Sequence, residues 1–314
     1  MTSLSWVIGG RGLLGSAVTR RLIAQGERTL TRQIVRWETP RAVSDLREGL
    51  ARLIDEADHG AGWRVYWCAG VGVTGSSADS LRAEVARFQA LIDAIRLLPG
   101  HVQSDGTVFV ASSAGAVYAG STGAPFDEAT LPHPIAEYGH AKLAIEAAAQ
   151  ELAEATEVRC LVGRIANLYG PGQSLAKPQG LISHLCLAYL KRRPLSVYVP
   201  LDTLRDYVFV DDCAALIVDA SMRLSESATV RYRMKVLASG RSVSIGALIG
   251  EFRRVIGRRP EIVMGSSAVS ALQSRDLRVR SVIWEDLDHR PKTNLADGIA
   301  RTLQDIRKSS FTST

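Results

Sequence analysis

Near its N-terminus the chain reads Leu4-Ser5-Trp6-Val7-Ile8-Gly9-Gly10-Arg11-Gly12-Leu13-Leu14-Gly15. The apolar run that ends at Ile8 predicts a strand, and the spacing of the apolar residues after Gly12 predicts a helix. Glycines between two such elements permit a tight turn and a close approach of the backbone to a pyrophosphate, whose charge the helix N-terminus favours. The stretch therefore predicts a dinucleotide-binding loop. The residues assigned to this loop are Gly9, Gly10, Arg11, Gly12, Leu13, Leu14 and Gly15.

Short β-rich runs alternate with helical patterns through the first half of the chain. The predicted strands are Trp6–Ile8, Gln33–Trp37, Arg64–Cys68, Thr107–Ala111 and Val158–Gly163. This alternation predicts an α/β fold, a Rossmann-type doubly wound parallel sheet, with a smaller α/β substrate-binding lobe. We expect the dinucleotide-binding domain at residues 1–168, with 206–240 returning to it, and the lobe at 169–205 and 241–314.

Composition narrows the class of protein. The chain has 314 residues and a formal net charge of +6, but it contains no run of five basic residues of the kind that binds nucleic acid. No apolar run has the length of a membrane span, and the start of the chain lacks a signal-peptide pattern. The cysteines have no metal-ligand spacing, which favours free thiols in a reducing compartment. We expect a cytoplasmic protein that uses no metal and binds neither nucleic acid nor a membrane.

A tyrosine and a lysine stand four residues apart in Tyr138-Gly139-His140-Ala141-Lys142. The pattern from Tyr138 to Glu154 is helical, so the two side chains share one helix face. A nearby ammonium favours the phenolate form of a tyrosine, which suits the phenol to acid–base catalysis. We predict that Tyr138 moves a proton to or from an alcohol oxygen, and that Lys142 supports it and holds the ribose of a nicotinamide. The alternative is a packing pair on the surface.

Two serines, Ser112 and Ser113, end a predicted strand at the place where an open α/β sheet binds its ligand. A hydroxyl there can hydrogen-bond the reacting oxygen. Ser113 is the predicted catalytic serine, and Ser112 is the alternative, otherwise assigned to substrate binding. Both hydroxyls also have a structural interpretation, as caps of the turn that follows.

Arg36, at the end of the second predicted strand, bears on the choice of dinucleotide. An acidic residue near this position usually bonds the ribose hydroxyls of NAD, whereas an arginine accommodates the 2′-phosphate of NADP. Arg36 and Arg11 together predict NADP. NAD is the alternative, in which Arg36 lies on the surface and Glu38 bonds the ribose.

Taken together, these features resemble the extended short-chain dehydrogenase/reductase family, in its nucleotide-sugar epimerase/reductase branch. The resemblance runs nearly from end to end of the chain. It rests on the motifs Gly9-x-x-Gly12-x-x-Gly15, Ser112-Ser113, Tyr138-x-x-x-Lys142, Arg164-x-x-Asn167-x-Tyr169-Gly170-Pro171, Pro194-Leu195-x-Val197-Tyr198 and Arg205-Asp206-Tyr207-Val208.

The resemblance implies roles for particular residues. The implied catalytic set is Ser113, Tyr138 and Lys142. Ala69 would belong to the cofactor site, and Asn167 and Arg205 would contact the diphosphate and the sugar of a nucleotide-sugar substrate. The family often dimerises through the helix of the tyrosine and the lysine, so we expect a homodimer in which the Ala144–Ala149 stretch allows close packing.

Three departures from the family pattern limit what the resemblance implies. Ser113-Ala114-Gly115 stands where sugar dehydratases carry Thr-Asp-Glu, which argues against dehydration. Val199-Pro200-Leu201 replaces the usual Gly-Asp-Gly, and Glu84 stands where an asparagine is expected.

The leading interpretation is an NADPH-dependent reductase of a nucleotide-linked keto-sugar, with Tyr138 as the proton donor. The alternative is an NAD(P)-dependent nucleotide-sugar epimerase, acting for example at C4, which oxidises and re-reduces one carbon with the same residues. A third hypothesis is a cofactor-binding protein without catalysis.

Overall fold

The computed structural model describes residues 3–31, 33–57, 60, 62–70, 72–73, 75–176, 179–258, 261–265 and 274–311. The chain forms two compact units. Unit 1 comprises residues 1–113, 137–164 and 214–235, and unit 2 comprises residues 114–136, 165–213 and 236–314. This division differs from the expected one chiefly at residues 114–136. That segment belongs to unit 2, where Phe126 forms a β-bridge with Val279 and its N–H donates to Arg278 O at 2.8 Å.

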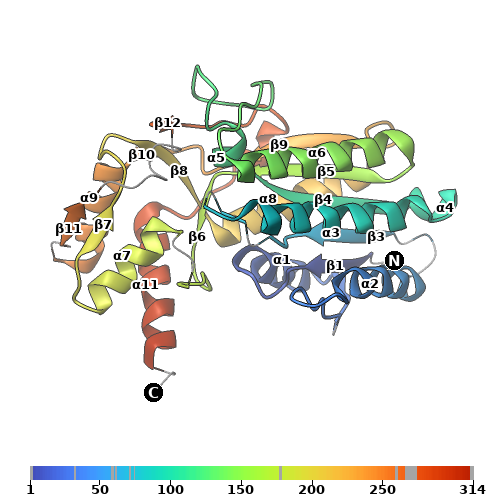
Figure 1. The fold of residues 1–314 in the computed structure, drawn as a ribbon, viewed down its shortest axis with the longest axis horizontal. Helices are drawn as coiled ribbons and strands as arrows, with labels where there is room; N and C mark the ends of the chain where they lie inside the picture. The colour runs from blue at the N-terminus through green and yellow to red at the C-terminus, as the bar shows by residue number, and fades with distance from the viewer. Residues whose placement is uncertain are drawn as a thin grey trace. The chain divides into compact units, whose positions relative to one another are not determined.

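The sheet of unit 1 has six strands in the order β2-β1-β3-β4-β5-β9 (Figure 1). Their bounds are β1 (Leu4–Ile8), β2 (Arg28–Thr29), β3 (Trp63–Trp67), β4 (Gly106–Ser113), β5 (Arg159–Ile165) and β9 (Tyr232–Leu237). β1 pairs in parallel with β2 and β3, and β3 pairs in parallel with β4. All residues of β3 are buried, as in a strand that is covered on both faces. The predicted parallel α/β sheet is confirmed.

Helices flank this sheet. Their bounds are α1 (Leu13–Ala24), α2 (Ala42–Glu56), α3 (Ala78–Arg96), α4 (Gly100–Gln103), α6 (Glu137–Ala155) and α8 (Val210–Ser225). α3 packs against both α2 and α6, and α6 also packs on β4. Buried apolar side chains fill the space between these layers. For example, the ring centroids of Trp67, on β3, and Phe88, on α3, lie 5.1 Å apart. The sheet and helices thus hold the carboxyl ends of β1, β3 and β4 in fixed positions.

The predicted strand at Gln33–Trp37 is wrong. The second strand is the shorter β2, at Arg28–Thr29, and residues 33–36 have no regular structure. The physical reason is that the Asp45 side chain takes the place of a neighbouring strand. Its carboxylate accepts a hydrogen bond from the N–H of Arg36 at 2.8 Å. The apolar pattern has a different origin, since Val35 and Trp37 pack against the core of unit 1.

Unit 2 is a smaller α/β assembly with its own core. Its elements are α5 (Ala114–Val117), β6 (Asn167–Tyr169), α7 (Leu181–Leu190), β7 (Leu195–Val197), β8 (Leu204–Phe209), β10 (Ser242–Ser244), α9 (Ile245–Ile256), β11 (Ile262–Met264), β12 (Asp276–Leu277), α10 (Glu285–Asp288) and α11 (Leu295–Phe311). β8 pairs with β6, β10 and β12. The core includes Tyr169, Phe209 and Phe252. This arrangement places Asn167 and Arg205 on neighbouring strands.

The cysteines carry free thiols, of which Cys160, Cys186 and Cys213 are buried and Cys68 is partly exposed. Burial raises the pKa of the Cys186 thiol to about 12, so it stays protonated near neutral pH. Among the described residues, no helix combines the length and apolar character needed to cross a bilayer.

Candidate functional site

The glycine loop lies between β1 and α1, as predicted, and its shape depends on glycine. Gly9 has φ +87°, and a Cβ on it would lie 2.7 Å from Ala69 N. A Cβ on Gly15 would lie 2.3 Å from Gly9 O, and Gly12 N donates to the same oxygen at 2.9 Å. The structure therefore brings Ala69, at the end of β3, against the loop.

The N-terminus of α1 fits the pyrophosphate of a dinucleotide. Its N-cap is Gly12, which provides no side-chain cap, and no acidic residue lies in the first turn. The N–H groups of this turn are thus open to an anion, which the helix dipole favours. Leu14 and Gly15 are buried and anchor the helix, whereas Arg11 is exposed beside it.

Arg36 has a partner that the sequence analysis did not anticipate. Its Nε donates to Asp45 Oδ2 at 3.0 Å, and its Nη2 lies 2.5 Å from Asp45 Oδ1. The Arg36 guanidinium, through hydrogen bonds and charge, lowers the pKa of the Asp45 carboxyl to about 2. The two charges therefore neutralise each other, and Arg36 is not the unpaired cation that the prediction of NADP assumed.

Tyr138 and Lys142 lie together on α6, as predicted. Lys142 Nζ is 5.6 Å from the centroid of the Tyr138 ring. The side chain of Lys142 is only 6% exposed, whereas Tyr138 is half-buried. A Cβ on Gly72, in the segment after β3, would lie 3.0 Å from two carbons of the Tyr138 ring. The segment that touches the glycine loop through Ala69 thus also touches the tyrosine.

Glu84 is a member of this cluster that the sequence analysis named only as a departure from the family pattern. Glu84 Oε1 accepts a hydrogen bond from Lys142 Nζ at 2.9 Å, and both side chains are buried. A sequence signal for this pairing exists, because Glu84 falls on the apolar stripe of α3 together with Leu81 and Phe88. A carboxylate on a buried helix face requires a cation or other polar partners.

The two serines at the end of β4 have different environments. Ser112 is buried, and its hydroxyl donates to Glu146 Oε1 at 2.5 Å. Arg164 holds the same carboxylate through both Nε and Nη2. Ser113 is half-buried. Ser112 therefore has an internal partner, and the assignment of Ser113 as the serine near the reacting oxygen stays a prediction.

Asn167 and Arg205 lie in unit 2. Asn167 Nδ2 donates to Asp206 O at 3.0 Å, and Arg205 Nη1 donates to Leu204 O at 2.8 Å. Arg205 is buried, and within the described part of the chain no carboxylate forms an ion pair with it. Burial lowers the pKa of its guanidinium. A buried cation of this kind favours an anionic ligand.

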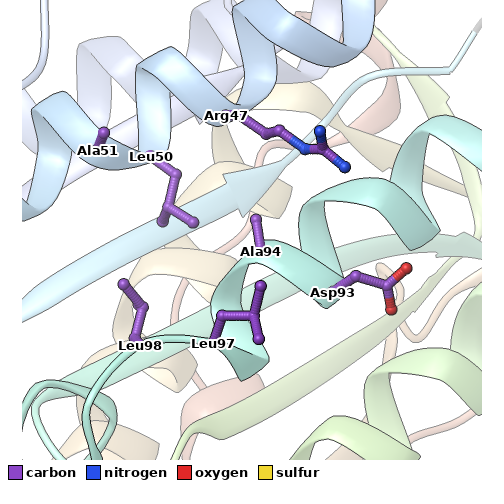
Figure 2. Close-up of a pocket in the computed structure, with 7 residues that line it drawn as sticks. All are labelled: Arg47, Leu50, Ala51, Asp93, Ala94, Leu97 and Leu98. Carbon is purple, nitrogen blue, oxygen red and sulfur yellow. The ribbon is translucent and has the colours of Figure 1, made fainter.

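A hollow of about 450 Å³ lies elsewhere in unit 1, between α2 and α3 (Figure 2). The residues that line it are Arg47, Leu50, Ala51, Asp93, Ala94, Leu97 and Leu98. It includes none of the predicted site residues. We therefore locate the candidate site by the side-chain clusters and not by this hollow.

The model of the NAD dependent epimerase/dehydratase family matches residues 6–230. The UDP-glucose 4-epimerase of Mycolicibacterium smegmatis is 25% identical over 97% of this chain and 98% of its own. The dTDP-4-dehydro-6-deoxyglucose reductase of Escherichia coli is 26% identical over 64% of this chain and 61% of its own.

Solved structures resemble the whole chain. The UDP-glucose 4-epimerase of Thermotoga maritima with UDP-glucose has a TM-score of 0.78 and 22% identity, and covers 99% of this chain and 100% of its own. MoeE5 in complex with UDP-glucose and NAD has a TM-score of 0.74 and 23% identity, with the same coverage. At these identities the likeness establishes the fold, and it agrees with the Rossmann-type class predicted from the sequence.

Proposed function

Since the chain belongs to the NAD dependent epimerase/dehydratase family, whose model covers residues 6–230, we propose that it is a nucleotide-sugar epimerase that uses NAD. The observation that most directly supports this proposal concerns the segment after β3. In this segment Ala69 packs against Gly9, and Gly72 packs against Tyr138. This segment links the predicted cofactor loop to the predicted proton-transfer residue within unit 1.

The chain's own residues then have distinct tasks. A bound nicotinamide dinucleotide supplies a group that accepts and returns a hydride. Tyr138 takes the proton of the sugar hydroxyl when the carbon is oxidised, and gives it back when the carbon is reduced. Lys142 favours the phenolate between these steps, and Ser113 donates a hydrogen bond to the reacting oxygen.

Arg205 and Asn167 are the proposed contacts of the nucleotide sugar. Arg205 is a buried guanidinium without a carboxylate in ion-pair range among the described residues, so a diphosphate would compensate a charge that the fold leaves buried. Among the described residues, the side-chain hydrogen bond of Asn167 uses Nδ2, which leaves its side-chain oxygen as an acceptor for a sugar hydroxyl.

NAD is the proposed cofactor because the positive charge that would select NADP is already neutralised. Arg36 forms two side-chain hydrogen bonds with Asp45, whose own side chain is 1% exposed and cannot turn away into solvent. A 2′-phosphate approaching Arg36 would also approach this carboxylate. The family description, which names NAD, agrees with this proposal.

A turnover experiment tests the proposed function. Purified protein is incubated with UDP-glucose and NAD, and the C4 epimer is sought by chromatography and NMR. We expect the epimer to form without net reduction of NAD. Tyr138→Phe should lower kcat by roughly a hundredfold or more, because it removes the proton donor while keeping the ring. Absence of epimerisation with a panel of UDP- and dTDP-sugars would refute the epimerase.

Keto-sugar reduction is the second candidate function, and one observation favours it. The E. coli dTDP-4-dehydro-6-deoxyglucose reductase matches 64% of this chain. The same experiment separates the two, since a reductase given a nucleotide-linked 4-keto-sugar consumes one reduced cofactor per product, whereas an epimerase consumes none.

A further inference from the structure

We propose that Glu84 is a positioning residue for proton transfer: its carboxylate holds the ammonium of Lys142 and offsets part of the positive charge that acts on Tyr138. The inference rests on the proposed role of Tyr138 in proton transfer. It adds a fourth residue to the predicted set, at a position where an asparagine is expected from the resemblance.

The carboxylate of Glu84 is fixed on several sides. Oε1 accepts from Lys142 Nζ at 2.9 Å, and Oε2 lies 3.4 Å from Gly72 N. A Cβ on Gly70 would lie 2.9 Å from Glu84 Oε1, so the backbone at Gly70 lies directly against the carboxylate. The side chains of Glu84 and Lys142 are 8% and 6% exposed, which excludes most of the water that weakens surface ion pairs. One glutamate therefore joins α3, α6 and the segment that contacts Tyr138.

The charges around Lys142 identify Glu84 as the carboxylate directed at it. Although burial lowers the pKa of Lys142, the charges of Tyr138, Glu84 and Glu146 raise it above the usual value. Glu146 has its own cation, because Arg164 donates from Nε to its Oε1 and from Nη2 to its Oε2. Glu84 makes its ion pair with Lys142 itself. Within the described part of the chain, no guanidinium forms an ion pair with Glu84, so its negative charge acts on Lys142.

This pairing has a consequence for the tyrosine. An unpaired ammonium beside Tyr138 would strongly favour the phenolate, and the proton would then be slow to return. A carboxylate bonded to that ammonium weakens its effect while keeping the lysine in place. An epimerase needs Tyr138 to lose and regain a proton in each cycle, so a moderated charge suits the proposed reaction.

The test compares Glu84→Gln with wild type, because glutamine keeps the shape and the acceptor for Gly72 but removes the charge. The near-ultraviolet phenolate signal of Tyr138 is obtained by subtracting the titration of the matching Tyr138→Phe variant. We expect its midpoint in Glu84→Gln to fall by about one pH unit, a tenfold change in phenolate at a given pH. The acid limb of the kcat/KM profile should move in the same direction. Glu84→Asp should restore the wild-type midpoint.

A matched control separates this role from a purely structural one. Glu27→Gln breaks another largely buried ion pair, with Arg64, that does not involve Lys142. It should lower the melting temperature and leave the Tyr138 midpoint unchanged. A midpoint that stays constant or rises in Glu84→Gln overturns the proposal. The spectroscopic titration needs no substrate, so it decides the role of Glu84 even if no nucleotide sugar is turned over.

Discussion

At the scale of single residues, Arg36 shows how a nearby partner changes the meaning of a side chain. As a lone guanidinium beside a glycine loop it predicts NADP. The structure pairs it with Asp45, which is nine positions further along the chain and buried in the first turn of α2. The side chain of Arg36 is still 46% exposed, so it can interact with a ligand, but its charge is offset. We therefore expect cofactor choice to depend on the pair and not on the arginine alone.

Removing the charge of Asp45 should change the cofactor preference. In Asp45→Asn the guanidinium of Arg36 keeps an acceptor but loses its counter-charge, so a 2′-phosphate meets an uncompensated cation. We expect affinity for NADP to rise roughly tenfold, about 1.4 kcal/mol, while affinity for NAD stays nearly constant. Fluorescence titration of both dinucleotides measures this.

Asp55→Asn is the control for this change, because it removes the same charge from an exposed position on the same helix. It should leave both affinities unaltered. Wild-type protein that already binds NADP more tightly than NAD would contradict the proposed cofactor.

At the scale of elements, the turn from β1 to α1 depends on Gly9 for two separate reasons. Its φ of +87° disfavours any residue with a Cβ, and that Cβ would meet the backbone of Ala69 at 2.7 Å. Gly9→Ala should therefore displace the loop from the end of β3 and weaken dinucleotide binding by roughly a hundredfold, because the backbone N–H groups lose their alignment.

Gly26→Ala separates these two causes. Gly26 has φ +77°, but apart from its chain neighbours no atom of the described residues lies within 4 Å of the position of its Cβ. Its substitution should cost about 1 kcal/mol of stability from backbone strain alone and leave cofactor affinity intact. Equal losses of affinity in the two variants would show that the contact with Ala69 has no role in binding.

Local sequence patterns made the elements predictable. Contacts between residues far apart in the chain could not be predicted from such patterns. The glycine loop, and the shared helix face of Tyr138 and Lys142, depend on residues only a few positions apart. The spacing of these residues in the sequence therefore suffices to predict both features. Glu84 meets Lys142 across 58 positions, and only the packing of α3 on α6 brings them together. The strand predicted at Gln33–Trp37 is wrong for a similar reason. The side chain of Asp45, on α2, accepts the hydrogen bond of the Arg36 N–H, which a neighbouring strand would otherwise accept.

At the scale of the whole molecule, the expected homodimer depends on a surface of α6. On this helix His140, Ala144, Ala147 and Glu151 are exposed at helical spacing, while Lys142 is buried. Two small side chains at the middle of the exposed stripe permit a close approach of a second helix. The face that would contact a second copy is therefore different from the face that carries the ammonium of Lys142.

A bulky charge on this stripe should separate assembly from cofactor binding. We expect wild-type protein to be a dimer in light scattering coupled to size exclusion, and Ala147→Arg to be a monomer, because a desolvated guanidinium without a partner is costly at a packed interface. Dinucleotide affinity should persist, since Ala147 is exposed and the glycine loop lies on other elements. Ala300→Arg adds the same charge at an exposed position of another helix, α11, and should remain dimeric. A monomeric wild type, or an Ala147→Arg variant that stays dimeric, would exclude this face of α6 as the dimer interface. The proposed proton-transfer cluster would then operate within an isolated chain or in a different assembly.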